Sequence, residues 1–271
     1  MLKRFKIRKS RPKQEASGAT KELPEKEHLH DLLIHDLTGL LSVASATAAN
    51  LLQKPDRYGP LSEQQRRMVD RILRNVEKAQ TLLHEMMEIS RSEEGLFKRE
   101  LFPVERTLKE SFIDALELIA PQAAEKLCRV EDQKEMQEIL RPQGIFVEIT
   151  GRYCNTPFCH DPRKVQQILR NLISNALKYR REQMFLSITG DMDLLILVED
   201  DGLGIPPEER EAVFKRFFRL KDKRNTDVPG IGLGLTGVKA LLVAMKGEII
   251  LENREGGGTR FMARIPPLQP H

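Results

Sequence analysis

The hydrophobic pattern of this chain changes its period once, at Glu93-Glu94-Gly95. Before that point, apolar residues recur at alternating spacings of three and four, which is typical of helices that pack along a seam. After it, short apolar segments typical of strands alternate with helical segments. The sequence therefore predicts an all-α N-terminal half followed by an α/β C-terminal half.

Two amphipathic helices are expected in the N-terminal half. The first runs from about Leu29 to Leu52, with a seam of Leu33, Leu37, Leu40, Ala44, Thr47 and Leu51. Pro and Gly in residues 54–60 end it, and Ser62 with Gln65 forms a capping-box pattern for the second helix. That helix ends near Ser92 and carries a seam of Val69, Leu73, Val76, Leu83 and Met86. A lone helical hairpin cannot enclose these seams, so we expect two copies to pair into a homodimeric four-helix bundle.

The C-terminal half is expected to form an α/β sandwich over residues 101–271, after a linker at 93–100. Strands are expected at 146–149, 194–198, 248–251 and 260–265, and helices at 165–177 and 235–245. Residues 122–144 have a helical, charged pattern to which we assign no chemistry.

The net charge of +4 comes from a basic tail, because the first thirteen residues hold seven positive and no negative charges, which leaves −3 for the rest. We interpret residues 1–27 as a disordered, solvated tail; contact with nucleic acid or an acidic membrane is the alternative. No apolar run approaches the ~20 residues of a membrane-spanning helix, and no secretory signal follows the basic start. A cytoplasmic location is therefore expected.

Two glycine-containing motifs suit a nucleotide. Asp200-Asp201-Gly202-Leu203-Gly204 directly follows an apolar strand pattern, so a carboxylate meets a turn that allows close ligand approach. Gly230, Gly232, Leu233 and Gly234 precede a helix, whose N-terminus and exposed N–H groups suit phosphate. The spacing matches neither a P-loop nor a dinucleotide-binding unit.

A third motif places polar side chains on one helix face. Asn171, Asn175, Lys178 and Tyr179 follow spacings of four, three and one, so they stack along the helix. Two amide oxygens and an ammonium suit a Mg²⁺–phosphate ligand; an ordinary polar helix face is the alternative.

These motifs occur in order with an aromatic stretch (Phe214, Phe217, Phe218 and Arg219) and a final Gly257-Gly258-Thr259. The series resembles the ATP-binding domain of sensor histidine kinases, in the GHKL superfamily shared with heat-shock chaperone ATPases, type II topoisomerases and mismatch-repair ATPases. The hairpin at 28–92 is similar to the family's dimerisation and phosphotransfer domain.

The resemblance implies ATP and Mg²⁺ as cofactors and a role for each matching residue. Asp200 would bind the adenine amino group, and Thr259 would support that end of the site. Asn175, assisted by Asn171, would ligand Mg²⁺, while Lys178 and Tyr179 would approach the phosphates and ribose. The glycines Gly202, Gly204, Gly230, Gly232 and Gly234 would shape the pocket and its lid, a short basic segment at about 221–229.

His35-Asp36 in the first helix is the expected phosphoacceptor pair. His35 lies about 200° around the helix from Leu33 and from Leu37, which turns it away from the seam. Asp36 can orient the imidazole and accept its ring proton. His30-Asp31, at the start of the helix, is the rival pair. The family carries Thr, Asn or Gln four residues after the histidine for phosphatase activity, and Gly39 stands there, so that activity is in doubt.

The sequence thus predicts a histidine kinase that autophosphorylates His35 and phosphorylates an aspartate of a response-regulator receiver domain, with an upstream sensor protein as a further partner. The alternatives are a non-catalytic adaptor with a degenerate ATP-binding fold, and a protein-serine kinase or ATPase of the same superfamily, which would leave the hairpin unexplained. Cys154, Cys159 and His160 form a weak zinc pattern, and we interpret them instead as a solvent-side loop. Three cysteines do not make a disulfide framework.

Overall fold

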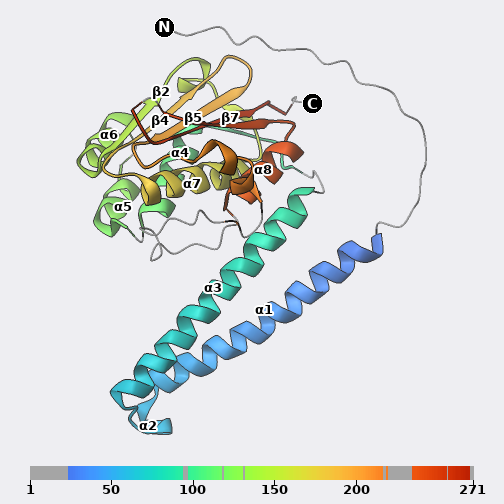
Figure 1. The fold of residues 1–271 in the computed structure, drawn as a ribbon, viewed down its shortest axis with the longest axis vertical. Coiled ribbons are helices and arrows are strands. Elements are labelled where there is room, and N and C mark those ends of the chain that lie inside the picture. The colour runs from blue at the N-terminus through green and yellow to red at the C-terminus, as the bar shows by residue number, and fades with distance from the viewer. Residues whose placement is uncertain are drawn as a thin grey trace.

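The computed structural model describes residues 24–93, 97–117, 119–130, 132–215, 218, 234–254 and 256–268. Two long helices, α1 (Pro24–Gln53) and α3 (Glu63–Glu93), run antiparallel and contact each other, with the short helix α2 (Pro55–Tyr58) between them (Figure 1). The backbone N–H of Ser62 donates to Gln65 Oε1, and that of Gln65 donates to Ser62 Oγ. The capping box expected at the start of the second helix is therefore confirmed.

The two expected seams differ in burial within the hairpin formed by α1 and α3. On α3, Val69 and Val76 are buried and Leu73 is half-buried. On α1, however, Leu37, Leu40, Ala44 and Thr47 are exposed. The better-buried residues of α1 are their neighbours, Leu41, Ser45 and Ala48. Most of the described seam of the first helix is therefore exposed in a single chain, with Leu51 half-buried, while the described seam of the second helix packs within the hairpin.

The C-terminal half is built on a five-stranded mixed sheet with strand order β2-β4-β5-β7-β6 (Figure 1). Its strands are β2 (Ile145–Ile149), β4 (Met184–Thr189), β5 (Leu194–Asp200), β6 (Glu248–Asn253) and β7 (Thr259–Ile265). The β2–β4 pair is parallel and the other pairs are antiparallel. The short strands β1 (Glu100–Phe102) and β3 (Phe158–His160) form a separate antiparallel pair. The helices are α4 (Val104–Leu116), α5 (Pro121–Cys128), α6 (Gln133–Leu140), α7 (Pro162–Tyr179) and α8 (Gly234–Ala244).

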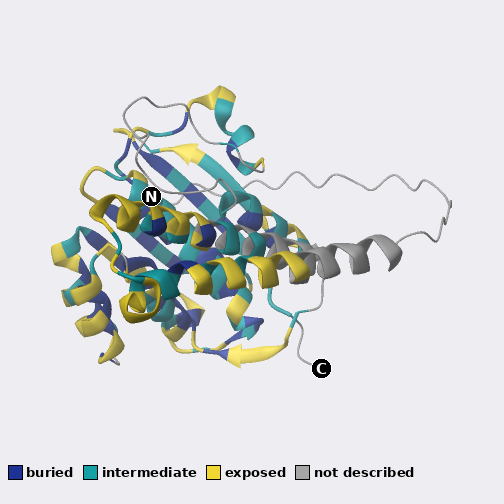
Figure 2. Ribbon diagram, turned by 90° about the horizontal axis from the view of Figure 1, so that it is seen from below, coloured by how far each residue is buried: buried dark blue, intermediate teal, exposed yellow. Residues whose placement is uncertain are grey.

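The core lies between one face of the sheet and the helices. On β5, Leu194, Ile196 and Val198 are buried while Leu195 is exposed, so the strand has one covered face. The covering layer includes α4 and α7, which pack against each other, and α7 contacts β5. Figure 2 shows the buried residues along the strands of the sheet. The expected α/β sandwich is therefore confirmed.

Some elements differ from their expected extent. Strands β1 and β4 were not expected, and the charged region at 122–144 forms α5 and α6. The interpretation of residues 154–160 as a solvent-side loop is wrong for residues 158–160, which form β3, and His160 is fully buried. In the described part of the chain, no helix is both long enough and apolar enough to cross a membrane.

Candidate functional site

Asp200, the last residue of β5, is a buried carboxylate held by backbone donors. Its Oδ1 accepts the N–H of Gly202 at 2.8 Å and that of Thr259, on the neighbouring strand β7, at 3.3 Å. Burial raises the pKa of Asp200, and the hydrogen bonds from Gly202 and from the backbone and hydroxyl of Thr259 oppose that rise. These contacts fix the carboxylate at the end of the central strand.

Three glycines allow the backbone to approach this carboxylate closely. A Cβ at Gly202 would clash with the carbonyl oxygen of Tyr179, the last residue of α7. A Cβ at Gly258, whose φ is +103°, would clash with the Asp200 carbonyl oxygen. Gly204 also has a left-handed φ, +76°, and lies against Gly258. The end of α7, the turn after β5 and the start of β7 therefore meet here, and only glycine fits at these points.

The adjacent carboxylate, Asp201, accepts a different set of backbone N–H donors. It accepts the backbone N–H groups of Arg181, Glu182 and Gln183 at 2.8 to 3.2 Å. Burial raises the pKa of Asp201, but these N–H donors outweigh that effect and leave the pKa below its ordinary value. Asp201 therefore holds the turn between α7 and β4.

Helix α7 brings the expected polar face towards the same region. Asn171, Asn175 and Lys178 are half-buried, and Lys178 Nζ lies 5.0 Å from the ring centre of the exposed Tyr179. Asn171 meets the first residue of α8: a Cβ at Gly234 would lie 3.5 Å from Asn171 Oδ1. The N-terminus of α8, which attracts anions, therefore adjoins the amide that was expected to assist a metal.

The donor set near α8 fits Mg²⁺ better than zinc. Amide oxygens and phosphate are ligands that Mg²⁺ prefers, and Asn171 and Asn175 supply such oxygens. In the described ranges, no group of three or more His, Cys, Asp or Glu side chains gathers as a metal site. The Cys154 thiol donates to the Ile149 carbonyl, and the His160 ring is buried.

Several expected site residues have no described position or side chain. Arg219, Gly230, Gly232 and Leu233 lie outside the described residues. His35 lies within α1, but its side chain is also outside the described part; Asp36 is exposed.

Two residues of the region were given no role from the sequence. Asn253 Oδ1 accepts the N–H of Ile205 and so holds the loop after Gly204. Asp161 caps α7 by accepting the N–H groups of Arg163 and Lys164. A signal for Asp161 was present, because Asp followed directly by Pro is a common helix start. Asn253 carried no such local signal.

Comparison with known proteins agrees with this geometry. Residues 160–269 match the family described as histidine kinase-, DNA gyrase B-, and HSP90-like ATPase. That segment spans the start of α7, the Asp200 turn and all of α8, β6 and β7. The C-terminal part of the chain is therefore an ATPase domain of this family.

Relatives found by sequence identify the class of protein more closely. The chain is 31% identical over 192 residues to the sensor histidine kinase WalK of Bacillus subtilis, covering 68% of this chain and 28% of that protein. It is 29% identical over 245 residues to the circadian input-output histidine kinase CikA of Synechococcus elongatus, covering 87% of this chain and 30% of that protein. The chain thus spans less than a third of these relatives. It is a homologue of the sensor histidine kinases.

Solved structures show the same fold. Full-length ShkA in complex with AMPPNP superposes with a TM-score of 0.64 at 21% identity, over 90% of this chain and 46% of that chain. The histidine kinase AdeS of Acinetobacter baumannii gives a TM-score of 0.51 at 22% identity, over 83% of this chain and 95% of that chain.

Proposed function

We propose that the chain is a homodimeric histidine kinase that phosphorylates its own His35 from Mg-ATP. The phosphoryl group then passes to an aspartate of a response-regulator receiver domain. The observation that carries the proposal is Asp200, a buried carboxylate fixed by Gly202 and Thr259 beside the end of α7. An input from an upstream sensor protein and a cytoplasmic location remain predictions.

Each part of the site has a task in this reaction. Asp200 accepts a hydrogen bond from the adenine amino group, and Thr259 holds the Asp200 carboxylate in place. Asn175 and Asn171 present oxygens to Mg²⁺, which when bound neutralises phosphate charge. Lys178 and the N-terminus of α8 favour the phosphates electrostatically, and Tyr179 approaches the ribose. Such positioning and charge neutralisation supply most of the catalysis in phosphoryl transfer.

The acceptor is an imidazole nitrogen of His35. It forms a bond to the γ-phosphorus while the bond from that phosphorus to the ADP oxygen breaks, and Asp36 takes the ring proton. Asp36 is exposed on α1, so an incoming domain has access to this position. At Gly39, an added Cβ would meet no atom within 4 Å. Because glycine has no side chain to position a water, we propose that phosphatase activity is weak.

The test is incubation of the full chain with Mg²⁺ and γ-labelled ATP, followed by acid or base. Label on histidine is lost in acid and kept in base, and it then moves to a cognate receiver domain. A protein-serine kinase would give acid-stable label. A non-catalytic adaptor would incorporate none and would lack Mg²⁺-dependent affinity for ATP; either result would contradict the proposal.

The exposed apolar residues of the hairpin support dimerisation. On each helix an exposed apolar residue precedes a better-buried one by one position: Leu40 precedes Leu41, and Met68 precedes Val69. One position is a rotation of about 100°. Because the helices are antiparallel, this rotation turns both sets towards the same side of the hairpin. The resulting apolar stripe consists of Leu37, Leu40, Val43, Met68 and Ile72, each at least 46% exposed. A second copy of the hairpin would cover it.

Substitution Leu40→Asp is expected to separate the dimer. Leu40 is 68% exposed in the single chain, so the charge is tolerated there, but in the bundle it would lose water without a partner. We expect the dimer dissociation constant to rise on the order of a hundredfold or more. Sedimentation equilibrium over a range of protein concentrations measures it.

Ala46→Asp is the matched control, because Ala46 is exposed on the same helix about 120° from Leu40. It should leave the dissociation constant within a few-fold of wild type. Equal weakening by both substitutions, or none by either, would contradict this interface.

A further inference from the structure

The segment that enters the ATPase domain from the hairpin is held at two adjacent residues. Helix α3 ends at Glu93 and β1 begins at Glu100. Between them, the Phe97 ring lies against the His160 ring, with 5.3 Å between centroids. The backbone N–H of Lys98 donates to Asp161 Oδ2 at 3.1 Å. His160 and Asp161 thus hold Phe97 and Lys98 of the incoming chain, and we call these four residues the clasp.

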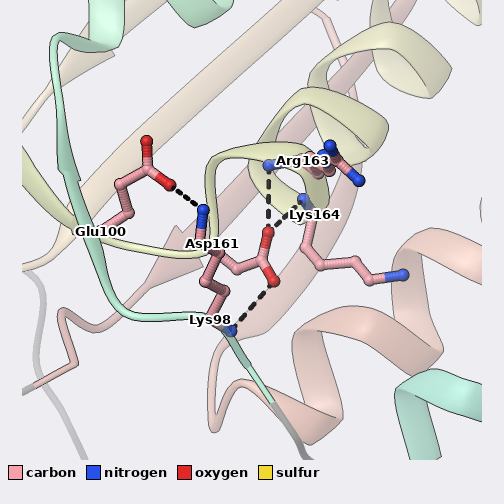
Figure 3. A network of polar contacts seen from close by, with 5 residues as sticks. All are labelled: Lys98, Glu100, Asp161, Arg163 and Lys164. Carbon is pink, nitrogen blue, oxygen red and sulfur yellow. Dashed lines mark hydrogen bonds and ion pairs between the residues drawn. The ribbon is translucent and has the colours of Figure 1, made fainter.

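Asp161 serves two elements with one carboxylate. Oδ1 accepts the N–H groups of Arg163 and Lys164 in the first turn of α7, while Oδ2 accepts Lys98 (Figure 3). Asp161 as a whole is only 8% exposed. A buried carboxylate that accepts three N–H donors is held firmly, so the incoming segment and the start of α7 move together.

His160 provides the apolar half of the clasp. It is fully buried, its Nδ1 accepts the Asp161 N–H at 2.8 Å, and its ring stacks on Phe158. Burial lowers the pKa of His160 to about 4, so the ring is neutral near pH 7 and presents an uncharged surface to Phe97.

The clasped helix is also the helix of the nucleotide site. Helix α7 begins beside Asp161 and carries Asn171, Asn175 and Lys178 further along. Its 18 residues extend about 27 Å. The clasp therefore fixes the position at which the chain from the hairpin, which holds the acceptor, meets α7, the helix that holds the phosphates.

We propose that Asp161, with His160, is a positioning residue for phosphoryl transfer, because it sets where the chain from the hairpin meets the ATPase domain. This inference rests on the proposed kinase function. With the clasp closed, three residues (94–96) separate the end of α3 from the first held residue; with it open, six residues (94–99) precede β1. The effective concentration of the hairpin at the ATPase domain falls with roughly the −3/2 power of the length of the linker that joins them. Doubling the linker therefore lowers this effective concentration about threefold.

Two substitutions at one position separate the clasp from its surroundings. Lys98→Pro removes the N–H that Asp161 accepts and leaves the α7 cap intact. Lys98→Ala keeps that N–H and removes only the exposed ion pair between Lys98 Nζ and Glu100 (2.7 Å). At saturating ATP, we expect autophosphorylation by Lys98→Pro to be about threefold slower than by Lys98→Ala, which should match wild type. Affinity for a Mg²⁺–ATP analogue should be the same in all three proteins.

Equal autophosphorylation rates in the two variants, or a parallel loss of analogue affinity, would overturn the proposal, because the second result indicates a merely structural role. Phe97→Ala tests the other half of the clasp if Lys98→Pro does not fold, and it should slow the reaction similarly at unchanged affinity. Hydrogen exchange at the Lys98 amide gives a readout independent of phosphorylation. Phe97→Ala should accelerate that exchange, and unchanged exchange would overturn the clasp even if the wild-type chain proves not to be a kinase.

Discussion

A chain with His35 replaced by glutamine is expected to incorporate no acid-labile phosphate from labelled ATP. Glutamine keeps a polar side chain of similar length on α1 but has no nucleophilic ring nitrogen, so the covalent step has no acceptor. Incorporation should fall by at least about a hundredfold, to background. Affinity for Mg-ATP should remain within about twofold of wild type, because Asp200 and α7 lie in the other half of the chain.

His30→Gln is the matched control, since His30-Asp31 is the other histidine–aspartate pair of this helix. It should incorporate phosphate at the wild-type rate. Persistent label in His35→Gln would exclude His35 as the acceptor, and loss of label in His30→Gln alone would assign the acceptor to the rival pair.

Asp200→Asn is expected to weaken nucleotide binding while preserving the fold. The asparagine oxygen can still accept the N–H groups of Gly202 and Thr259, and a neutral group at this buried position avoids the cost that raises the pKa of Asp200. The charged acceptor for adenine is lost, which corresponds to roughly a 10- to 100-fold weaker affinity. Calorimetric titration with a Mg²⁺–ATP analogue and a denaturant unfolding curve measure the two quantities.

The neighbouring carboxylate provides the comparison. Asp201→Asn weakens the hold on the N–H groups of residues 181–183, so it should lower the free energy of unfolding. Its affinity for the nucleotide analogue should change by less than about threefold. If both variants lose affinity equally, Asp200 supports the turn and does not recognise adenine.

The parts of this molecule that were predictable from the sequence depend on local pattern. Leu194 to Val198 gave a strand because the run is apolar and a Gly-containing turn follows it, and β5 confirms it. The capping box at Ser62 was equally local. Strand β1 was not predicted, because it has three residues and Leu101 is 66% exposed, so no burial pattern marks it.

The clasp was not predictable for a different reason. The hydrogen bond from Lys98 to Asp161 joins residues 63 apart, and neither sequence position carries a signal of the other. The packing of the hairpin was also only partly accessible, because heptad spacing identifies an apolar side of a helix without saying which neighbour covers it. In the structure, four described residues of the first seam are exposed, whereas Val69 and Val76 of the second seam are buried within the hairpin.

This division of apolar surface gives the two halves of the chain different sources of stability. Of the described hairpin residues, the buried apolar side chains are Ala48, Val69 and Val76, whereas a continuous core runs from Phe102 to Ile265 in the other half. If two hairpins pair as proposed, the folding free energy of the hairpin contains an association term that obeys mass action, and that of the nucleotide-binding half does not. A cell that makes few copies would hold chains still competent for ATP whose acceptor helix is poorly ordered. Expression level alone would then set a threshold for signalling.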